Sequence, residues 1–303
     1  MSTSFSRPPL AEEHAPRRRR LGCLLGSLLV GALLVTGVYV GVEWFRTGMD
    51  LGGQVCRATA AGTTVTFTPE QMDNAATIVG IGMGRGLPAR AGTIAIATAI
   101  QESKLRNIDY GDRDSLGLFQ QRPSQGWGTP EQILTPEFST NAFYDALVRI
   151  DGYQDMVITE VAQEVQRSAF PDAYADHETE GRVIASTLAG HTAESMVCRL
   201  DAPTGHTVHD DLVVDLQSHL GLTGTIDADG RTLTVETADP QQAWSVGQYL
   251  VAKAERHAVT EVQVDDRRWV RRSGPTSLEW QSADASVGPT TVVATLTPTP
   301  TES

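Results

Sequence analysis

The chain has 303 residues and a formal net charge of −13, with 40% hydrophobic and 20% charged residues. This length predicts about two domains, and the apolar content is sufficient for a packed core. The acidic balance argues against general nucleic-acid binding, which requires a basic face. The charge is unevenly distributed: residues 1–42 contain five arginines against Glu12 and Glu13, a net charge of +3, so the remaining residues account for −16.

An uncharged apolar run occupies residues 21–42 and follows four arginines, Arg17 to Arg20. As a helix, such a run is long enough to cross a bilayer, and arginines before it favour a cytoplasmic N-terminus. A cleaved signal peptide is the alternative, but Glu43 and Trp44 follow the run where a small-residue cleavage site would stand. The sequence therefore predicts a disordered cytoplasmic tail (1–20), a transmembrane helix (21–42) and a single-pass cell-membrane protein whose bulk is extracytoplasmic.

Two cysteines, Cys56 and Cys198, lie outside the apolar run, whereas Cys23 lies within it. In an oxidising exterior two such cysteines can form a disulfide, although two unrelated thiols are the alternative. A disulfide between them would enclose one domain, at 56–198. A stalk at 43–67 would lead into this domain.

The tripeptide Thr-Pro-Glu occurs at 68–70, 129–131 and 135–137. Threonine can cap a helix, proline suits its first position, and glutamate suits the positive end of the helix dipole. Glutamine follows the first two tripeptides and completes two capping boxes. Together with apolar periodicity these signals predict a mainly α domain, with helices at about 69–84, 90–104, 130–134, 136–150, 159–169 and 178–190.

After Cys198 the pattern changes to a mixture of helices and strands. Residues 201–282 predict a small α+β module with helices at 210–220 and 241–257 and strands at 225–226, 232–237, 261–264 and 268–271. The Thr/Pro-rich tail, 283–303, has few core-forming residues and is predicted to be disordered.

Glu102 lies near the end of the predicted helix 90–104, which is apolar nearly all round and should be buried. Apolar neighbours disfavour the charged form of a carboxyl group, which raises its pKa and suits it to act as a general acid. A helix-terminal glutamate facing solvent is the alternative interpretation.

Glu102 is followed by Ser103, and fifteen residues after Glu102 comes the segment Gly117-Leu118-Phe119-Gln120. This combination resembles the Glu-Ser…Gly-Leu-Met-Gln signature of soluble lytic transglycosylases, which have a lysozyme-like fold and cleave peptidoglycan. The wider stretches 91–133 and 161–178 are similar to actinobacterial membrane-anchored lysozyme-like proteins. The resemblance implies a lysozyme-like domain at 56–198 with Glu102 as its catalytic acid/base, and no cofactor or metal.

The sequence departs from the family pattern at two points. Phe119 stands where methionine is usual, and the later Ala-Tyr-Asn-Ala-Gly motif is absent. Residues 165–168 could occupy its place, with Tyr174 beyond them.

Substrate-binding candidates follow partly from the resemblance and partly from side-chain chemistry. Amide groups suit the hydroxyl and N-acetyl groups of a neutral glycan, and aromatic rings can stack on sugars or can belong to the core. The candidates are Ser103, Gln120, Gln121, Trp127, Gln166 and Tyr174; Phe119 and Phe170 are further aromatic possibilities.

Most glycosidases need a second carboxylate, which Asp109, Asp112 or Asp114 could provide. The alternative, which we favour, is that these aspartates form turns and pair with Arg106 or Arg113. Lytic transglycosylases require no second carboxylate, so the family mechanism fits a single glutamate better.

The sequence thus predicts a membrane-anchored lytic transglycosylase that acts on the β-1,4 bond between N-acetylmuramic acid and N-acetylglucosamine. Its expected partners are peptidoglycan glycan strands and the cell membrane, through the N-terminal helix, but no nucleic acid. The alternative is a non-catalytic peptidoglycan-binding or cell-envelope scaffold protein whose 201–282 module recruits an envelope protein. His206 and His209 could bind a metal but fit a solvated linker better, so no metal site is predicted.

Overall fold

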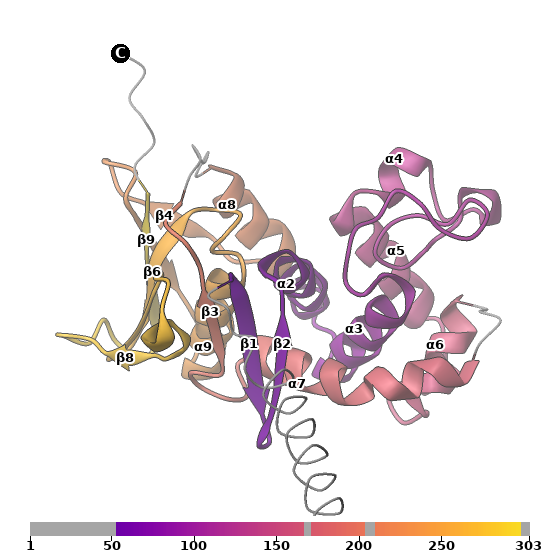
Figure 1. The fold of residues 1–303 in the computed structure, drawn as a ribbon, viewed down its shortest axis with the longest axis horizontal. Helices are drawn as coiled ribbons and strands as arrows, with labels where there is room; N and C mark the ends of the chain where they lie inside the picture. The colour runs from indigo at the N-terminus through magenta and orange to yellow at the C-terminus, as the bar shows by residue number, and fades with distance from the viewer. Residues whose placement is uncertain (1–52, 167–170, 204–209, 298–303) are drawn as a thin grey trace, which may run out of the picture. The chain divides into compact units, whose positions relative to one another are not determined.

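The computed structural model describes residues 53–166, 171–203 and 210–297, in which helices pack with two antiparallel sheets (Figure 1). The helices before Cys198 begin close to the predicted positions. They are α2 (Pro69–Gly84), α3 (Ala89–Ser103), α4 (Pro130–Ile133), α5 (Pro136–Leu147), α6 (Ile158–Gln166) and α7 (Glu178–Leu188), with a 3₁₀ segment η2 (Pro171–His177) before α7.

Two of the three predicted helix starts are complete capping boxes. The Thr68 side chain accepts a hydrogen bond from the backbone of Gln71, and Thr129 does the same with Gln132. Thr135 precedes α5 without a side-chain cap bond. The local sequence signals therefore fix where α2 and α4 begin.

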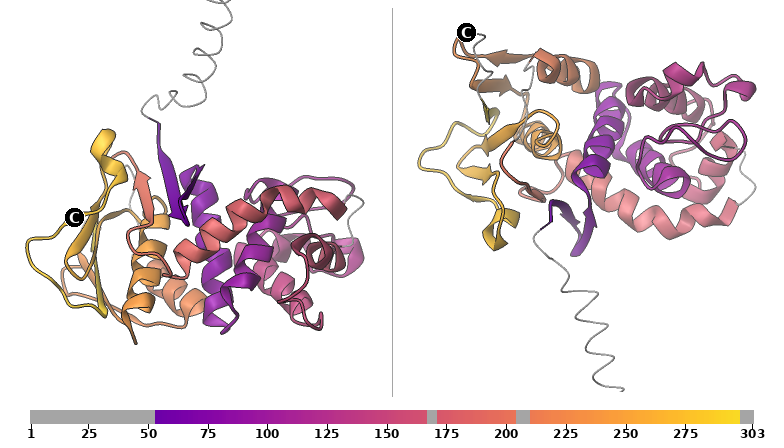
Figure 2. Two further views of the ribbon diagram at one scale, coloured as in Figure 1. Left: turned by 90° about the horizontal axis from the view of Figure 1, so that it is seen from below. Right: turned by 45° about the horizontal axis from the view of Figure 1, so that its top comes forward.

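Helix α3 is almost entirely buried, as its apolar sequence predicts. It packs between α2 and α7, and Gly181 of α7 allows a close approach because a Cβ there would lie 2.6 Å from the Thr93 carbonyl oxygen. The helix ends where Lys104 and Leu105 adopt positive φ angles of 56° and 58°. Glu102 therefore lies in the last turn of α3, a buried helix. Figure 2 shows this helix among the other helices.

The smaller sheet has the strand order β2-β1-β3, formed by β1 (Val55–Ala60), β2 (Thr63–Phe67) and β3 (Met196–Arg199). Cys56 lies directly opposite Cys198 in the β1–β3 pairing, and the two form a disulfide, which confirms that prediction. The predicted stalk at 43–67 is wrong for its second half, because residues 55–67 form a hairpin; residues 43–52 lie outside the described part.

The larger sheet has the order β4-β5-β9-β6-β7-β8. Helix α9 (Pro240–Ala252) packs on β6 and β9 and also contacts α2, α7 and β3. The strands are β4 (Gly224–Ile226), β5 (Thr232–Glu236), β6 (Val259–Val264), β7 (Arg267–Val270), β8 (Gln281–Ser282) and β9 (Thr291–Leu296). Helix α8 (Asp210–Asp215) and a π-helical turn η3 (Leu216–Leu220) precede them.

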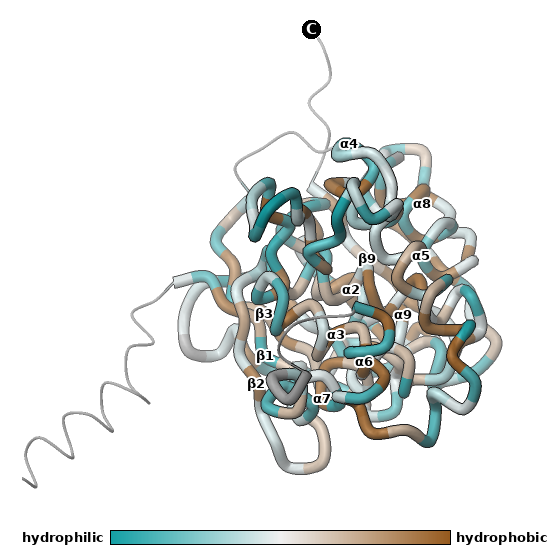
Figure 3. Tube along the Cα trace, turned by 90° about the vertical axis from the view of Figure 1, so that its right-hand side faces the viewer, coloured by the Kyte–Doolittle hydropathy of each residue, from teal (hydrophilic) through white to brown (hydrophobic). Residues whose placement is uncertain are grey.

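The prediction of a disordered tail at 283–303 is wrong for the residues that the structure describes. Thr291–Leu296 forms β9, which joins the two halves of the larger sheet. Its side chains Val292, Ala294 and Leu296 are buried, and β9 is among the hydrophobic segments in Figure 3. Threonine and valine are strong strand formers, so a composition typical of a loose tail also suits a strand once neighbours cover it.

The predicted division into a mainly α domain (56–198) and a separate α+β module (201–282) is also corrected, because Gly52–Ser303 form one compact unit. Gln248 of α9 is fully buried and accepts a hydrogen bond from the Ser195 backbone, and the Trp269 indole donates to the Cys198 carbonyl at 3.0 Å. The later strands therefore complete the core that the helices begin.

The membrane part of the predicted fold and the predicted cell-membrane location are not supported. Within the described ranges, every helix is too short or too polar to cross a bilayer. The run at 21–42 that the sequence analysis assigned to a transmembrane helix lies outside these ranges.

Candidate functional site

Glu102 is half-buried, and its carboxylate is held by two polar side chains from the segment that follows α5. The hydroxyl group of Tyr174 donates a hydrogen bond of 2.6 Å to Glu102 Oε1. Tyr174 lies on η2 and is 0% exposed, so its hydroxyl is fixed in position. Gln166, the last residue of α6, also hydrogen-bonds the Glu102 carboxylate.

Two opposing effects set the acidity of Glu102. Burial disfavours the carboxylate and raises its pKa, whereas the hydrogen bonds from Tyr174 and Gln166 stabilise the carboxylate and lower it. Burial dominates, so the pKa of Glu102 is raised above its ordinary value of 4.5. The group thus remains a proton donor at a higher pH than a solvated glutamate.

Ser103 connects α3 to the Gly-Leu-Phe-Gln segment rather than facing solvent. Its buried hydroxyl lies 2.8 Å from the Leu118 carbonyl oxygen and 3.0 Å from that of Ala99. The same segment is closed by a β-bridge between Leu116 and Gln121. Ser103 therefore fixes the loop beside Glu102.

The two predicted groove glutamines have different positions. Gln121 is 1% exposed, and its amide donates to the Ser139 carbonyl of α5 at 3.0 Å, so it holds the loop against that helix. Gln120 is half-buried, and its amide nitrogen lies 3.2 Å from the Gly117 carbonyl oxygen and 3.3 Å from that of Tyr110. Both amide groups thus bond within the protein.

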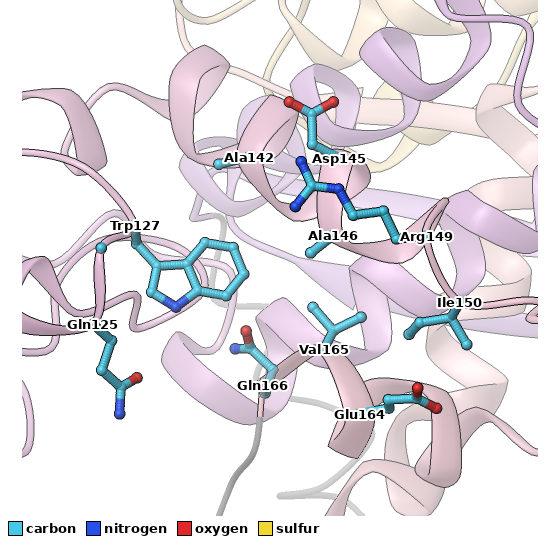
Figure 4. A pocket seen from close by; sticks show the side chains of 11 residues that line it. Gln125, Trp127, Ala142, Asp145, Ala146, Arg149, Ile150, Glu164, Val165 and Gln166 are labelled. Atoms are coloured by element: carbon cyan, nitrogen blue, oxygen red, sulfur yellow. The ribbon is translucent and has the colours of Figure 1, made fainter.

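A pocket of about 740 Å³ lies between the loop that carries Trp127 and helices α5 and α6 (Figure 4). Figure 4 shows the Trp127 indole on one side and Gln166 and Val165 of α6 facing it. Gln166 contacts both the pocket and Glu102: it lines the pocket and hydrogen-bonds the Glu102 carboxylate. Its amide also donates a hydrogen bond of 2.6 Å to the Phe119 carbonyl. Trp127 and Gln166 are therefore placed where a ligand in the pocket would meet them.

Sequence reasoning missed three charged residues that line this pocket: Asp145, Arg149 and Glu164. Asp145 accepts a hydrogen bond of 2.6 Å from Arg85, the residue that caps the end of α2. None of the three belongs to a recognisable motif. The sequence contained one signal for two of them. Asp145 and Arg149 are four residues apart near the end of a helix, a spacing that places two side chains on the same face.

The aspartates considered as second carboxylates belong to the loop after α3. Asp114 pairs with Arg122 at 2.8 Å and accepts from the backbone of Ser124. These contacts hold its pKa far below the ordinary value, so Asp114 is a carboxylate that stabilises the loop. Its partner is Arg122 rather than the predicted Arg106 or Arg113. Asp109 and Asp112 are exposed, and Asp112 pairs with Arg113 at 3.9 Å, as predicted.

Phe119 belongs to the core, the alternative considered for it. It is 0% exposed and stacks on Phe143 of α5 with ring centroids 4.6 Å apart. Phe170 lies outside the described residues. Neither a protein-family model nor a curated protein matches the chain.

Proposed function

We propose that this chain cleaves peptidoglycan glycan strands at the β-1,4 bond between N-acetylmuramic acid and N-acetylglucosamine, as a lytic transglycosylase does. The observation that carries the proposal is Glu102, a half-buried acid with a raised pKa, held by Tyr174 and by Gln166, which also lines the pocket. The likeness of Glu102-Ser103 and residues 117–120 to the transglycosylase signature supports the same chemistry.

In the proposed reaction Glu102 first acts as an acid and then as a base. Its carboxyl proton passes to the glycosidic oxygen, and the bond from that oxygen to the muramic anomeric carbon breaks. The C6 hydroxyl of the same sugar then bonds to the anomeric carbon and returns its proton to the Glu102 carboxylate. The products are an anhydromuramyl end and a free N-acetylglucosamine end, with no water consumed.

The hydrogen bonds around Glu102 suit this double role. In the carboxylate state Oε1 accepts from Tyr174, which stabilises the charge that forms after the first proton transfer. Burial opposes that charge and so favours return of the proton. The site therefore keeps both protonation states accessible.

A hydrolytic reaction would need a second carboxylate to activate water. Among the carboxylates considered from the sequence, Asp114 already forms an ion pair with Arg122. Glu164 lines the pocket and is exposed, so it is the carboxylate to test for hydrolysis.

The test is mass spectrometry of the fragments released from purified peptidoglycan by the full chain under oxidising conditions. Wild type should release anhydromuramyl fragments, and Glu102→Gln should lose at least about 10²-fold in rate, because general acid catalysis contributes that much or more. Glu160→Gln is the matched control, since Glu160 is an exposed residue of α6.

Reducing-end fragments that disappear in Glu164→Gln would replace the transglycosylase proposal with a hydrolase. Retained binding to peptidoglycan with no released fragments, in the presence or absence of other envelope components, would contradict the enzyme proposal. The chain would then be a non-catalytic peptidoglycan-binding protein.

A further inference from the structure

A second group of polar side chains lies where the strands and helices after Cys198 meet the earlier helices. Glu137 of α5, Asp215 of α8 and His219 of η3 each offer one oxygen or nitrogen atom, and these atoms all lie within 4.8 Å of one another. Asp215 and His219 are buried, and Glu137 is half-buried. The pocket beside Glu102 includes none of the three.

The fold brings His219 to this position through a close approach of two elements. Gly80 and Gly84 of α2 face η3: a Cβ at Gly84 would lie 2.3 Å from the His219 carbonyl oxygen, and one at Gly80 would lie 3.3 Å from the His219 Cβ. The turn η3 is π-helical, a local deviation that is frequent at functional sites. A larger residue at Gly84 would therefore clash with the η3 backbone at His219.

The imidazole of His219 is oriented as metal-binding histidines are. Its Nδ1 lies 2.6 Å from the Tyr249 hydroxyl, and such a contact on one ring nitrogen fixes the ring and leaves the other free to bind. The other nitrogen, Nε2, is fully buried and has no hydrogen-bond partner among the described residues.

The geometry between His219 and Glu137 fits two ligands of one ion. Nε2 lies 3.4 Å from Glu137 Oε1, which is longer than a typical N–H···O hydrogen bond. Two ligands about 2.0–2.1 Å from a tetrahedral zinc ion are about 3.3 Å apart.

Asp215 has a supporting partner of the kind found around metal sites. His257 Nε2 lies 3.0 Å from Asp215 Oδ2, which orients the carboxylate. Lys253 lies 4.0 Å from the same oxygen, but it is closer to Asp73, at 3.0 Å.

Carboxylates outnumber the permanent cations around this group. Asp73, Glu137 and Asp215 face the permanent cations Lys253 and Arg256 and the imidazoles of His219 and His257. A divalent cation bound here would compensate the excess of carboxylates over permanent cations.

We propose that Glu137, Asp215 and His219 bind one zinc ion, which fastens α5 to the α8–η3 segment. Imidazole and carboxylate groups are usual zinc ligands, and water can complete the tetrahedron on the half-exposed Glu137 side. This site is independent of the glycan-cleaving function proposed above.

The test is zinc binding by the untagged full chain, measured by calorimetry, metal analysis after dialysis, and X-ray absorption at the zinc edge. Wild type should retain one zinc per chain, with nitrogen and oxygen ligands and no sulfur. His219→Gln and Glu137→Gln should lose it. Tyr249→Phe should weaken binding about 10- to 100-fold, since it removes the contact that orients His219.

His191→Gln, which removes an exposed histidine, and the double variant His206→Gln/His209→Gln should retain the ion. Circular dichroism of each zinc-free variant shows whether it is folded. If folded His219→Gln binds zinc as wild type does, the proposal is wrong. If wild type binds no zinc, the proposal is equally wrong.

Discussion

Burial and hydrogen bonding have opposite effects on the pKa of Glu102, so a change in either one should shift this pKa. Burial raises its pKa, and Tyr174 and Gln166 oppose that rise by stabilising the carboxylate. The sequence alone indicated the apolar neighbours of Glu102, but not the amide and phenol that reach it from α6 and η2. Those two side chains are 64 and 72 positions away in sequence, and no spacing rule connects them.

Replacing Tyr174 by phenylalanine should move the pH dependence of cleavage in a defined direction. The tyrosine hydroxyl donates to the carboxylate, so its removal should raise the pKa of Glu102 further. The acid form then persists to higher pH, and the alkaline limb of the kcat/KM profile should shift upward while the maximal rate falls. The measurement is kcat/KM against pH for both proteins. An unchanged or downward-shifted limb would show that Tyr174 does not act on the acidity of Glu102.

Other predicted site residues show why residue type and spacing alone are insufficient. Gln166 and Trp127 line the pocket, but Gln121 is buried against α5 and Ser103 bonds the Leu118 carbonyl. The motif places these residues near the acid, whereas their side-chain directions depend on the reversal after α3 and on how α5 packs. Those features arise from tertiary contacts.

At the level of elements, helices were predictable because their signals are local. Thr68 and Thr129 cap the helices that follow them, and α2 has the predicted bounds. The strands β3 and β9 were missed because their pairing partners are distant in sequence. The β1–β2 hairpin was also missed, although its two strands are adjacent in sequence. A threonine-rich segment forms a strand only where neighbouring strands have unpaired edges with which it can pair.

A charge on the buried face of β9 should therefore destabilise the protein strongly. Ala294→Asp would bury an unpaired carboxylate and should lower the free energy of unfolding by about 3–5 kcal/mol. Thr295→Asp, on the exposed face of the same strand, is the control and should change it by less than about 1 kcal/mol. Urea unfolding followed by circular dichroism measures both. Equal effects of the two substitutions would show that β9 does not have one buried face.

At the scale of the whole molecule, the segment after Cys198 shares its core with the earlier helices. Gln248 of α9 binds three backbone groups across this boundary: the Ser195 N–H and the carbonyls of Thr187 and Thr192. Since composition and length suggested separate domains, this continuity is a property of the packing and not of the sequence pattern.

Gln248→Leu should lower the stability of the described unit as a whole. The substitution leaves buried backbone groups without partners and should cost about 2–4 kcal/mol. Gln241→Leu, on the exposed side of the same helix, should cost under about 1 kcal/mol because it removes one bond, to the Ala189 carbonyl. Calorimetry should show one transition that moves to lower temperature in Gln248→Leu. Two separate transitions, with only one of them shifted, would contradict a shared core.

The position of β9 between β5 and β6 also affects how the chain is made. Ribosomes release β4 through β8 before β9, so until Thr291–Leu296 emerges the larger sheet consists of two fragments, each with an unpaired edge. Such edges pair readily with other chains. The unpaired edges of the nascent chain therefore need protection until β9 joins them. A premature stop codon just before Thr291 would leave the two fragments permanently unjoined, and we expect cellular proteases to remove that product.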